Sequence, residues 1–402
     1  MLHNLTELKV NCSALYQLPH AIGNLHSLVQ LELRENFLLN LPDSICELKN
    51  LRHLDLEDNR LDHLPDDFGA LVKLEELLLD KNHLSHLPIS FGHLRSLQSA
   101  DLCLNQIEKL PDNLSQLCQL ELLNLSKNFL EELPESIGSL SKLSILKVDQ
   151  NKLLSVTASI GECTNLTELI LNENLLESLP PSIGKLDKLI NLVLDSNRLR
   201  GLPEELVNCH QLRMLHLREN NITNLSDDFG KLTNLRVLDV AENNLQYLPL
   251  GLKDVELRAV WLSENQNQPL VRFTEESVIH DGHMKAALMC YMLPQTKKTQ
   301  EVLLRRSVIY SDDQPALRRS TEFAHSRLSV TFNMNENEVS EDYGTFTRKS
   351  TPHNKQLKEM ENIAKNLVKE PDTMKKMVST SSLASHASHT SSNKGLILVV
   401  NF

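Results

Sequence analysis

The fold is decided by a stretch that recurs through the first two thirds of the chain, LELLNLSKNFLEELPESIGSLSKL at residues 120–143. Its first half reads LxxLxLxxN and its second half reads LPxxIGxLxxL. The pattern returns with a constant 23-residue step, which predicts a solenoid of stacked repeats. With LxxLxLxxN numbered as slots 1 to 9, slot 9 holds Asn36, Asn59, Asn82, Asn105, Asn128, Asn151, Asn174, Asn197, Asn220 and Asn243.

Each half of the repeat has its own physical role. The Leu residues of slots 4 and 6 lie on one side of a short strand, and the residues of slots 3, 5 and 7 lie on the other side. A buried Asn in slot 9 has two donors and an acceptor, so we expect it to bond the turn backbone of its own and the adjacent repeat. In the second half, Pro suits a first helical position, and IGxLxxL places apolar residues on one face of a short helix or helical turn.

These halves together predict the fold class. Strands lie about 4.8 Å apart while helical segments are about 10 Å wide, so the stack must bend with its strands inside. The sequence predicts an α/β architecture, a right-handed leucine-rich repeat solenoid shaped as a horseshoe, with a parallel sheet on the concave side. About 11 to 12 repeats are assigned to residues 1–268 and a capping segment to residues 269–294, where the run from Lys285 is expected to be helical. Because the chain begins inside a repeat, Leu5, Leu8 and Val10 are expected to face water.

Charge separates residues 295–402 from the repeats. The 402 residues carry a net charge of −12, which argues against nucleic acid as a partner. Residues 295–402 hold 16 Lys and Arg against 12 Asp and Glu, so residues 1–294 carry −16. The last part lacks the 23-residue period and is rich in Ser and Thr, which predicts disorder. Basic residues there precede three candidate phosphorylation sites, Ser307, Ser320 and Thr351.

The concave side is the first place to look for a binding site, because core packing does not determine slots 3, 5 and 7. These slots are largely acidic in the first half of the solenoid and apolar in the second. We expect an exposed apolar stripe beside an exposed acidic one, which is typical of a protein-binding groove, although a Leu-biased sequence could also place these residues on a neutral solvated face. The acidic set is Glu32, Asp55, Glu57, Glu76, Asp80 and Asp101, and the apolar set is Leu122, Ile145, Ile170, Val193, Met214 and Val237.

Nothing in the sequence indicates catalysis. There is no HExxH or CxxC motif, and Cys103, although in an outward slot, has no base arranged beside it. We therefore expect no enzyme activity, metal, cofactor or small-molecule substrate. The longest apolar clusters are far shorter than the roughly 18 to 20 residues that span a bilayer, which favours a cytoplasmic protein that reaches membranes only through its partners.

Several stretches resemble one family closely. They are LVQLELREN (28–36), LSILKVDQNKL (143–153), VTASIGECTNLTELILNENLLESLP (156–180), LRAVWLSENQNQPLVRF (257–273) with CYMLPQ (290–295), and RKSTPH (348–353) in a short motif near 348–369. Together they resemble the LAP family of leucine-rich repeat and PDZ proteins, which includes Scribble, Erbin, densin and Lano. Relative to that family the sequence looks N-terminally truncated, and no PDZ domain follows the repeats.

The resemblance implies a function that composition and spacing do not. A LAP-like protein would be a non-enzymatic scaffold for basolateral cell polarity and cell junctions, peripheral at the basolateral membrane, with polarity or junctional proteins as partners. An alternative is a scaffold of Ras, other small-GTPase or phosphatase signalling, because other proteins with 23-residue LPxxIGxL repeats serve the Ras pathway. An enzyme that uses the repeats for targeting would require a catalytic domain after residue 294, and the sequence there has no nucleophile motif.

Overall fold

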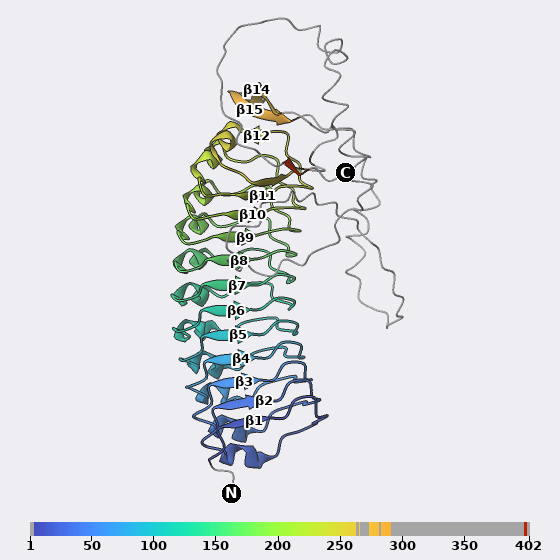
Figure 1. Ribbon diagram of the computed structural model, residues 1–402, viewed down its shortest axis with the longest axis vertical. Coiled ribbons are helices and arrows are strands. Elements are labelled where there is room, and N and C mark those ends of the chain that lie inside the picture. Colours follow the sequence, from blue (N-terminus) through green and yellow to red (C-terminus); the bar gives the residue numbers. More distant parts are fainter. Residues whose placement is uncertain (1–3, 263–264, 266–272, 281–282, 291–397, 400–402) are drawn as a thin grey trace, which may run out of the picture. The chain divides into compact units, whose positions relative to one another are not determined.

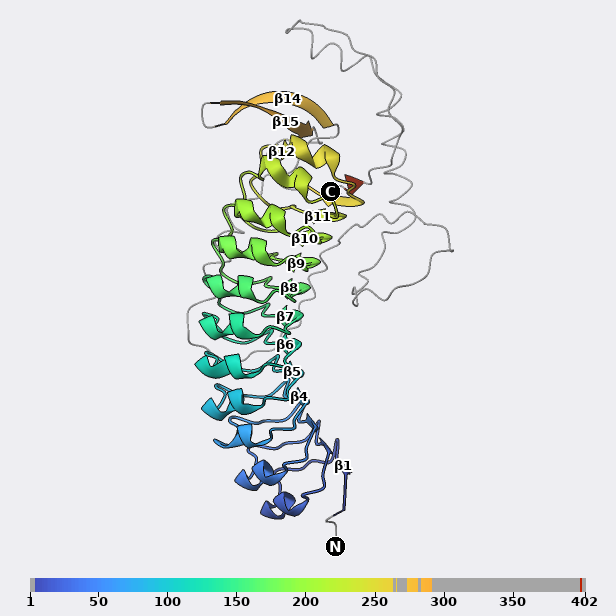
Figure 2. The same ribbon diagram turned by 90° about the vertical axis from the view of Figure 1, so that its left-hand side faces the viewer.

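The computed structural model describes residues 4–262, 265, 273–280, 283–290 and 398–399. The chain divides into two units, Met1–Pro294 and Gln295–Phe402. In the first unit, a short strand and a 3-10 helix alternate along the chain, with the strands on one side of the stack and the helices on the other (Figure 1). Figure 2 shows that this stack bends gently with its strands on the inner side. The predicted leucine-rich repeat solenoid is therefore confirmed.

Twelve strands, nearly all from LxxLxLxxN, form the parallel sheet of the first unit. Each is three residues long and has slot 4 at its centre. The strands are β1 (Glu7–Lys9), β2 (Gln30–Glu32), β3 (His53–Asp55), β4 (Glu76–Leu78), β5 (Ser99–Asp101), β6 (Leu122–Asn124), β7 (Ile145–Lys147), β8 (Glu168–Ile170), β9 (Asn191–Val193), β10 (Met214–His216), β11 (Val237–Asp239) and β13 (Ala259–Trp261).

The second half of each repeat forms a 3-10 helix, and in most repeats Pro is the residue immediately before it. Thr157 and Ser226 replace this Pro in two repeats, and each side chain accepts a hydrogen bond from the backbone N–H two residues on. The helices are η1 (His20–Asn24), η2 (Asp43–Glu47), η3 (Phe68–Ala70), η4 (Ile89–His93), η5 (Asp112–Gln116), η6 (Glu135–Ser139), η7 (Ala158–Glu162), η8 (Pro181–Lys185), η9 (Glu204–Asn208), η10 (Asp227–Lys231) and η11 (Leu250–Asp254).

The register of the sheet follows the sequence period. Leu123 lies opposite Leu146, and Leu169 lies opposite Leu192, each 23 residues away. Between β11 and β13 the shift is 22 residues, since Leu238 pairs with Val260. In-phase strands bring equivalent Leu residues together, and these rows form a continuous core inside the solenoid.

The core is tightly closed except at its first repeat. Leu31, Leu54 and Leu77, in slot 4 of consecutive repeats, have no exposed surface. Leu5, Leu8 and Val10 are half-buried, so the expected exposure of the first repeat is only partial. Near the other end, β12 (Leu248–Pro249), β15 (His283–Cys290) and β14 (Phe273–His280) form a separate antiparallel sheet.

The expectation of a helical run from Lys285 was wrong. This run lies in β15, where Leu288 pairs with Leu248 and Glu275, and Ala287 pairs with Pro249 and Glu276. Good helix-forming residues have therefore become a strand, because pairing on both sides overrides intrinsic propensity. Within the expected capping segment, residues 269–272, 281–282 and 291–294 lie outside the described residues, as do the candidate phosphorylation sites and 295–397 with the LAP-like motif. In the second unit, β16 comprises Leu398–Val399. Across the described parts of the chain, no helix has the length and apolarity needed to cross a membrane.

The slot 9 Asn residues form the predicted ladder through the turns. Asn220 is representative: its Nδ2 donates to the carbonyls of Leu194 at 2.9 Å and Leu217 at 3.0 Å. Its Oδ1 accepts the backbone N–H of Leu199 at 3.0 Å. One side chain thus bonds its own repeat and the preceding one. The residue before each of the ten Asn is left-handed, with φ between 53° and 58°, and this conformation lets the chain turn after the strand.

On the convex side, a glycine in most of the 3-10 helices lies close to the next helix. A Cβ on Gly161 would lie 2.7 Å from Cβ of Ser182 and nearer still to the Ser182 carbonyl oxygen. Gly23 is equally constrained, since its Cβ would lie 2.6 Å from the carbonyl oxygen of Ser44. Gly201, by contrast, has no atom within 4 Å of such a Cβ. The Gly of IGxL therefore lets these helices lie close together, whereas three other repeats carry Cys46, Ser115 and Val207 in the same slot.

Replacing Gly161 with Ala should destabilise the solenoid, because the added methyl group forces two helices apart. We expect a loss of about 1 to 3 kcal/mol in the free energy of unfolding. The measurement is urea denaturation followed by circular dichroism. Gly201→Ala is the matched control and should change stability by less than about 1 kcal/mol; equal losses in the two variants would contradict the close-packing explanation.

Replacing Asn220 with Ala should cost about 3 kcal/mol, because an N–H and two carbonyls of the turn lose a buried partner. The adjacent Asn221 is exposed, so Asn221→Ala should stay within about 0.5 kcal/mol of the unaltered chain. Chemical denaturation of both variants compares the two positions directly. If the Asn220→Ala and Asn221→Ala variants had the same unfolding midpoint, the Asn ladder would not contribute to stability as proposed.

Candidate protein-binding face

The concave face consists of the side chains in slots 3, 5 and 7, carried by β1 to β11 and β13 and by the residues just after them. Leu residues on the opposite side of the same strands are buried in the core, so the concave side chains are positioned by a rigid sheet. The strands are adjacent and in register, and each slot therefore forms a row across the face. The two predicted sets of residues occupy different parts of these rows.

The six apolar residues are all half-buried and lie on six successive strands, β6 to β11. They do not form one straight stripe. Leu122 pairs with Ile145 in slot 3, Ile170 pairs with Val193 in slot 5, and Met214 pairs with Val237, again in slot 3. The apolar surface therefore changes row twice, at β8 and at β10. Glu168 and Asn191 occupy slot 3 between the two outer pairs.

His216 belongs to this apolar surface, and the sequence analysis missed it. It lies in slot 5 of β10, where it pairs with Val193 on β9 and Asp239 on β11. Burial lowers the pKa of His216, which keeps its imidazole neutral at neutral pH. The slot 5 row thus continues from Ile170 through Val193 to a neutral ring. The slot number alone could have identified His216, but its burial depends on the neighbouring strands.

Half of the predicted acidic set is already paired with basic side chains of the same chain. Lys9 Nζ lies 3.0 Å from Glu32 Oε1, and Lys81 Nζ lies 2.6 Å from Glu57 Oε1. His53 Nδ1 lies 2.8 Å from Glu76 Oε2. Each partner comes from an adjacent repeat. Three of the six carboxylates are therefore already paired within the chain.

Two of the remaining acidic residues serve the backbone. Asp55 Oδ1 accepts the N–H of Glu57 at 3.1 Å, and Asp101 Oδ1 accepts the N–H of Cys103 at 3.0 Å. Asp239 repeats this geometry with the N–H of Ala241. Asp in slot 5, the last residue of the strand, thus caps the N–H of slot 7, two residues beyond the strand. Asp55 is only 4% exposed, so it has little surface to offer a partner.

Asp80, the remaining residue of the acidic set, has a strongly raised pKa. Burial raises its pKa to about 6, and the charges of Glu57 and Asp101 add to the effect. The pKa of the nearby Cys103 thiol rises to about 12, first through burial and then through Asp101. A thiol with this pKa remains protonated, and a protonated thiol is a poor nucleophile. Burial, together with the neighbouring carboxylates, therefore disfavours thiolate chemistry at Cys103.

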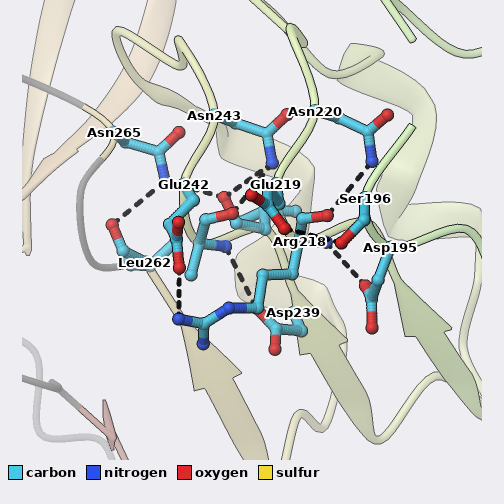
Figure 3. A network of polar contacts seen from close by, with 12 residues as sticks. Asp195, Ser196, Arg218, Glu219, Asn220, Asp239, Glu242, Asn243, Leu262 and Asn265 are labelled. Carbon is cyan, nitrogen blue, oxygen red and sulfur yellow. Dashed lines mark hydrogen bonds and ion pairs between the residues drawn. The ribbon is translucent and has the colours of Figure 1, made fainter. Parts of the chain in front are cut away.

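At the C-terminal end of the face, polar contacts join successive repeats (Figure 3). Asp195 accepts the backbone N–H of Arg218 at 2.7 Å, and the Arg218 guanidinium pairs with Glu242. Ser196 donates to Glu219 at 2.6 Å. These contacts hold slots 7 and 8 in place beside Met214 and His216. Within the described ranges, no group of three or more His, Cys, Asp or Glu residues is arranged to hold a metal ion.

Family models identify the class of protein that this fold and face define. A leucine rich repeat model matches residues 3–61, 27–84, 49–107 and 164–222, a two-copy model matches 210–253, and a single-repeat model matches 119–140. Together the matches cover more than half of the 402 residues. The chain belongs to the leucine-rich repeat proteins. Their repeat domains are typically non-enzymatic and bind other proteins.

Solved structures of leucine-rich repeat proteins resemble this chain. The ectodomain of the plant receptor kinase GASSHO1/SCHENGEN3 from Arabidopsis thaliana, in complex with CASPARIAN STRIP INTEGRITY FACTOR 2, has 31% identity and a TM-score of 0.53 over 64% of this chain and 35% of its own. The plant peptide hormone receptor RGFR1 in complex with RGF2 has 26% identity and a TM-score of 0.53 over 65% and 52%. A Leptospira interrogans leucine-rich repeat protein has 30% identity and a TM-score of 0.49 over 65% and 78%. The chain spans about half or less of the two plant receptors.

The titration of Asp80 should make stability fall as pH rises. An unfolded Asp titrates near 3.9, whereas the pKa of native Asp80 is about 6, so the native state binds more protons between these values. Stability contributed by protonated Asp80 is thus present below about pH 4 and lost by about pH 6. Asp80→Asn should flatten this dependence and add up to about 1 kcal/mol at pH 7, after allowance for solvent screening.

Thermal denaturation from pH 4 to pH 7.5 measures this effect. Asp66→Asn is the control, because Asp66 is exposed and lies outside the concave face. If the difference between Asp80→Asn and the unaltered chain were the same at every pH, the assigned cause would be wrong.

Proposed function

We propose that this chain is a protein-binding scaffold without enzyme activity and that its concave face holds the partner. The observation that carries the proposal is the surface of half-buried apolar side chains on β8 to β11, formed by Ile170, Val193, Met214 and Val237 together with the neutral His216. The fold gains nothing evident from apolar residues in these slots, since the core lies on the other side of the strands. Burying them against a partner would be favourable.

Two further considerations support a protein partner. The plant receptors similar to this chain are described in complex with RGF2 and with CASPARIAN STRIP INTEGRITY FACTOR 2, and the same general mode of use is proposed here. In addition, the sheet behind the face is rigid, so a partner would bind without much ordering of the scaffold, which limits the entropic cost of association.

The particular role we propose is in basolateral cell polarity and cell junctions. The LAP-like stretches quoted above support this role, above all LRAVWLSENQNQPLVRF and the RKSTPH motif, because the Leu pattern does not require them. The partners would be polarity or junctional proteins, and they would hold the chain peripherally at the basolateral membrane. Scaffolding of small-GTPase or phosphatase signalling is the alternative role, in which the same face would hold a regulator of that pathway.

Replacing both Ile170 and Val193 with Glu should abolish partner capture. Two carboxylates would then need desolvation at the centre of the interface, while the half-buried positions leave them hydrated in the free chain. We expect at least tenfold weaker capture of junctional proteins by proximity labelling in polarised epithelial cells, loss of basolateral enrichment, and a nearly unchanged melting temperature.

The matched control carries the same chemical changes on the other side of the solenoid. Val72 and Ile89 are 47% and 79% exposed and lie beside η3 and in η4, so Val72→Glu with Ile89→Glu should leave capture intact. Undiminished capture by the Ile170/Val193 variant would rule out the concave face. Loss of labelled small-GTPase regulators without junctional proteins would favour the alternative role.

A further inference from the structure

A second surface lies beside the concave face, on the lateral wall where the chain leaves each strand. It is a shallow groove of about 480 Å³ lined by slots 8 to 10 of four successive repeats, from Asp58 to Lys127. The slot 9 Asn residues form part of its lining, and the side chains of slots 8 and 10 project around them. This lateral groove is separate from the slots that form the concave face.

Leu104 is an unusual residue for its position in this groove. It occupies slot 8 with φ of 54°, a left-handed conformation that is unfavourable for a branched, bulky side chain. The same slot holds Asp58 and Lys81 in the two preceding repeats and Lys127 in the next. Leu104 is nevertheless 39% exposed, so it gains only part of the benefit of burial. Neither backbone preference nor core packing accounts for a Leu here.

Apolar surface continues from Leu104 along the same wall. Gln106 lines the groove from slot 10, and Phe129 occupies the same slot in the next repeat. The Phe129 side chain is 44% exposed. Leu154 lies one repeat further on and is 58% exposed. Leu104, Phe129 and Leu154 follow one another at intervals of 25 residues. They therefore occupy slots 8, 10 and 12 of three successive repeats. The Lys152 Nζ is 4.8 Å from the centre of the Phe129 ring, and it places a cation beside this surface.

The groove itself is lined by more cations than anions. Arg60, Lys81 and Lys127 line it, against a single carboxylate, Asp58. Lys81 is paired with Glu57, whereas Lys127 has no ion pair within the described part of the chain.

We propose that the lateral groove binds an acidic, amphipathic segment of a partner protein. The acidic residues of that segment would lie over Arg60 and Lys127, and its apolar residues would cover Leu104, Phe129 and Leu154. The segment would bind in one direction, because the cations of Arg60 and Lys81 are in earlier repeats and the exposed Phe129 and Leu154 are in later ones. Charge complementarity selects the partner, and the apolar residues supply surface to bury.

The test is fluorescence polarisation with the full chain and a labelled synthetic peptide in which a run of Glu and Asp precedes alternating Leu and Ser. Leu104→Asn should weaken binding at least tenfold while leaving the melting temperature unchanged or raised, since Asn accepts the left-handed conformation better than Leu. Lys127→Glu should weaken binding at least tenfold as well, and Lys127→Arg should preserve it. A peptide with Lys in place of its acidic residues should bind at least tenfold more weakly.

The controls separate this groove from other surfaces. Leu39→Asn, at an exposed Leu of an earlier repeat, and the Ile170→Glu/Val193→Glu variant should both leave peptide affinity unchanged. The proposal is overturned by the absence of saturable binding up to about 1 mM peptide, by equal affinity of the Leu104→Asn variant, or by loss of binding in the concave-face variant. It is also overturned if sedimentation shows that the chain dimerises through this wall, since a second copy would then be the occupant.

Discussion

The structure depends on the hydrogen bonds of the buried Asn in slot 9. Each of these side chains joins two repeats, as Asn151 does when it donates to Leu125 at 2.9 Å and Val148 at 3.2 Å and accepts from Leu130 at 3.0 Å. Without this side chain the turn backbone would be buried with no partner, because the ladder of the parallel sheet ends just before it. The same bonds recur at every repeat, so the Asn ladder, like the Leu rows of the core, holds the solenoid through contacts between nearest neighbours.

Because the buried Leu and Asn residues maintain the fold, the outward slots are available for binding. Leu and Asn maintain the stack, while slots 3, 5 and 7 on the concave face and slots 8 and 10 on the lateral wall can vary. The two proposed surfaces have different chemistry: the concave face presents apolar pairs and a neutral His216, and the lateral groove presents cations around Leu104. A scaffold with two such surfaces could hold two partners at once, because binding to one does not occupy the residues of the other.

Where sequence reasoning failed, contacts between distant or neighbouring segments were responsible. The run from Lys285 has good helix formers, but β12 and β14 lie on either side of it and provide strand partners that a local pattern cannot reveal. Asp55 was expected to be exposed because its slot points outward, yet it turns back to cap the N–H of Glu57. The apolar set was expected to form a stripe, but the cross-strand register places Ile170 and Val193 in a different row from Met214 and Val237.

By itself, the sequence determined the solenoid, its 23-residue register, the buried Asn ladder and the helical turns of the opposite wall, because a strict period repeats the same local preferences at every step. It also identified which residues the concave slots contain. Only the tertiary structure decided how those residues are used: which carboxylates are paired, which cap the backbone, how burial keeps His216 neutral, and how slots 8 to 10 of four repeats enclose a groove. These properties depend on distances and solvent exclusion between repeats, and no single repeat contains that information.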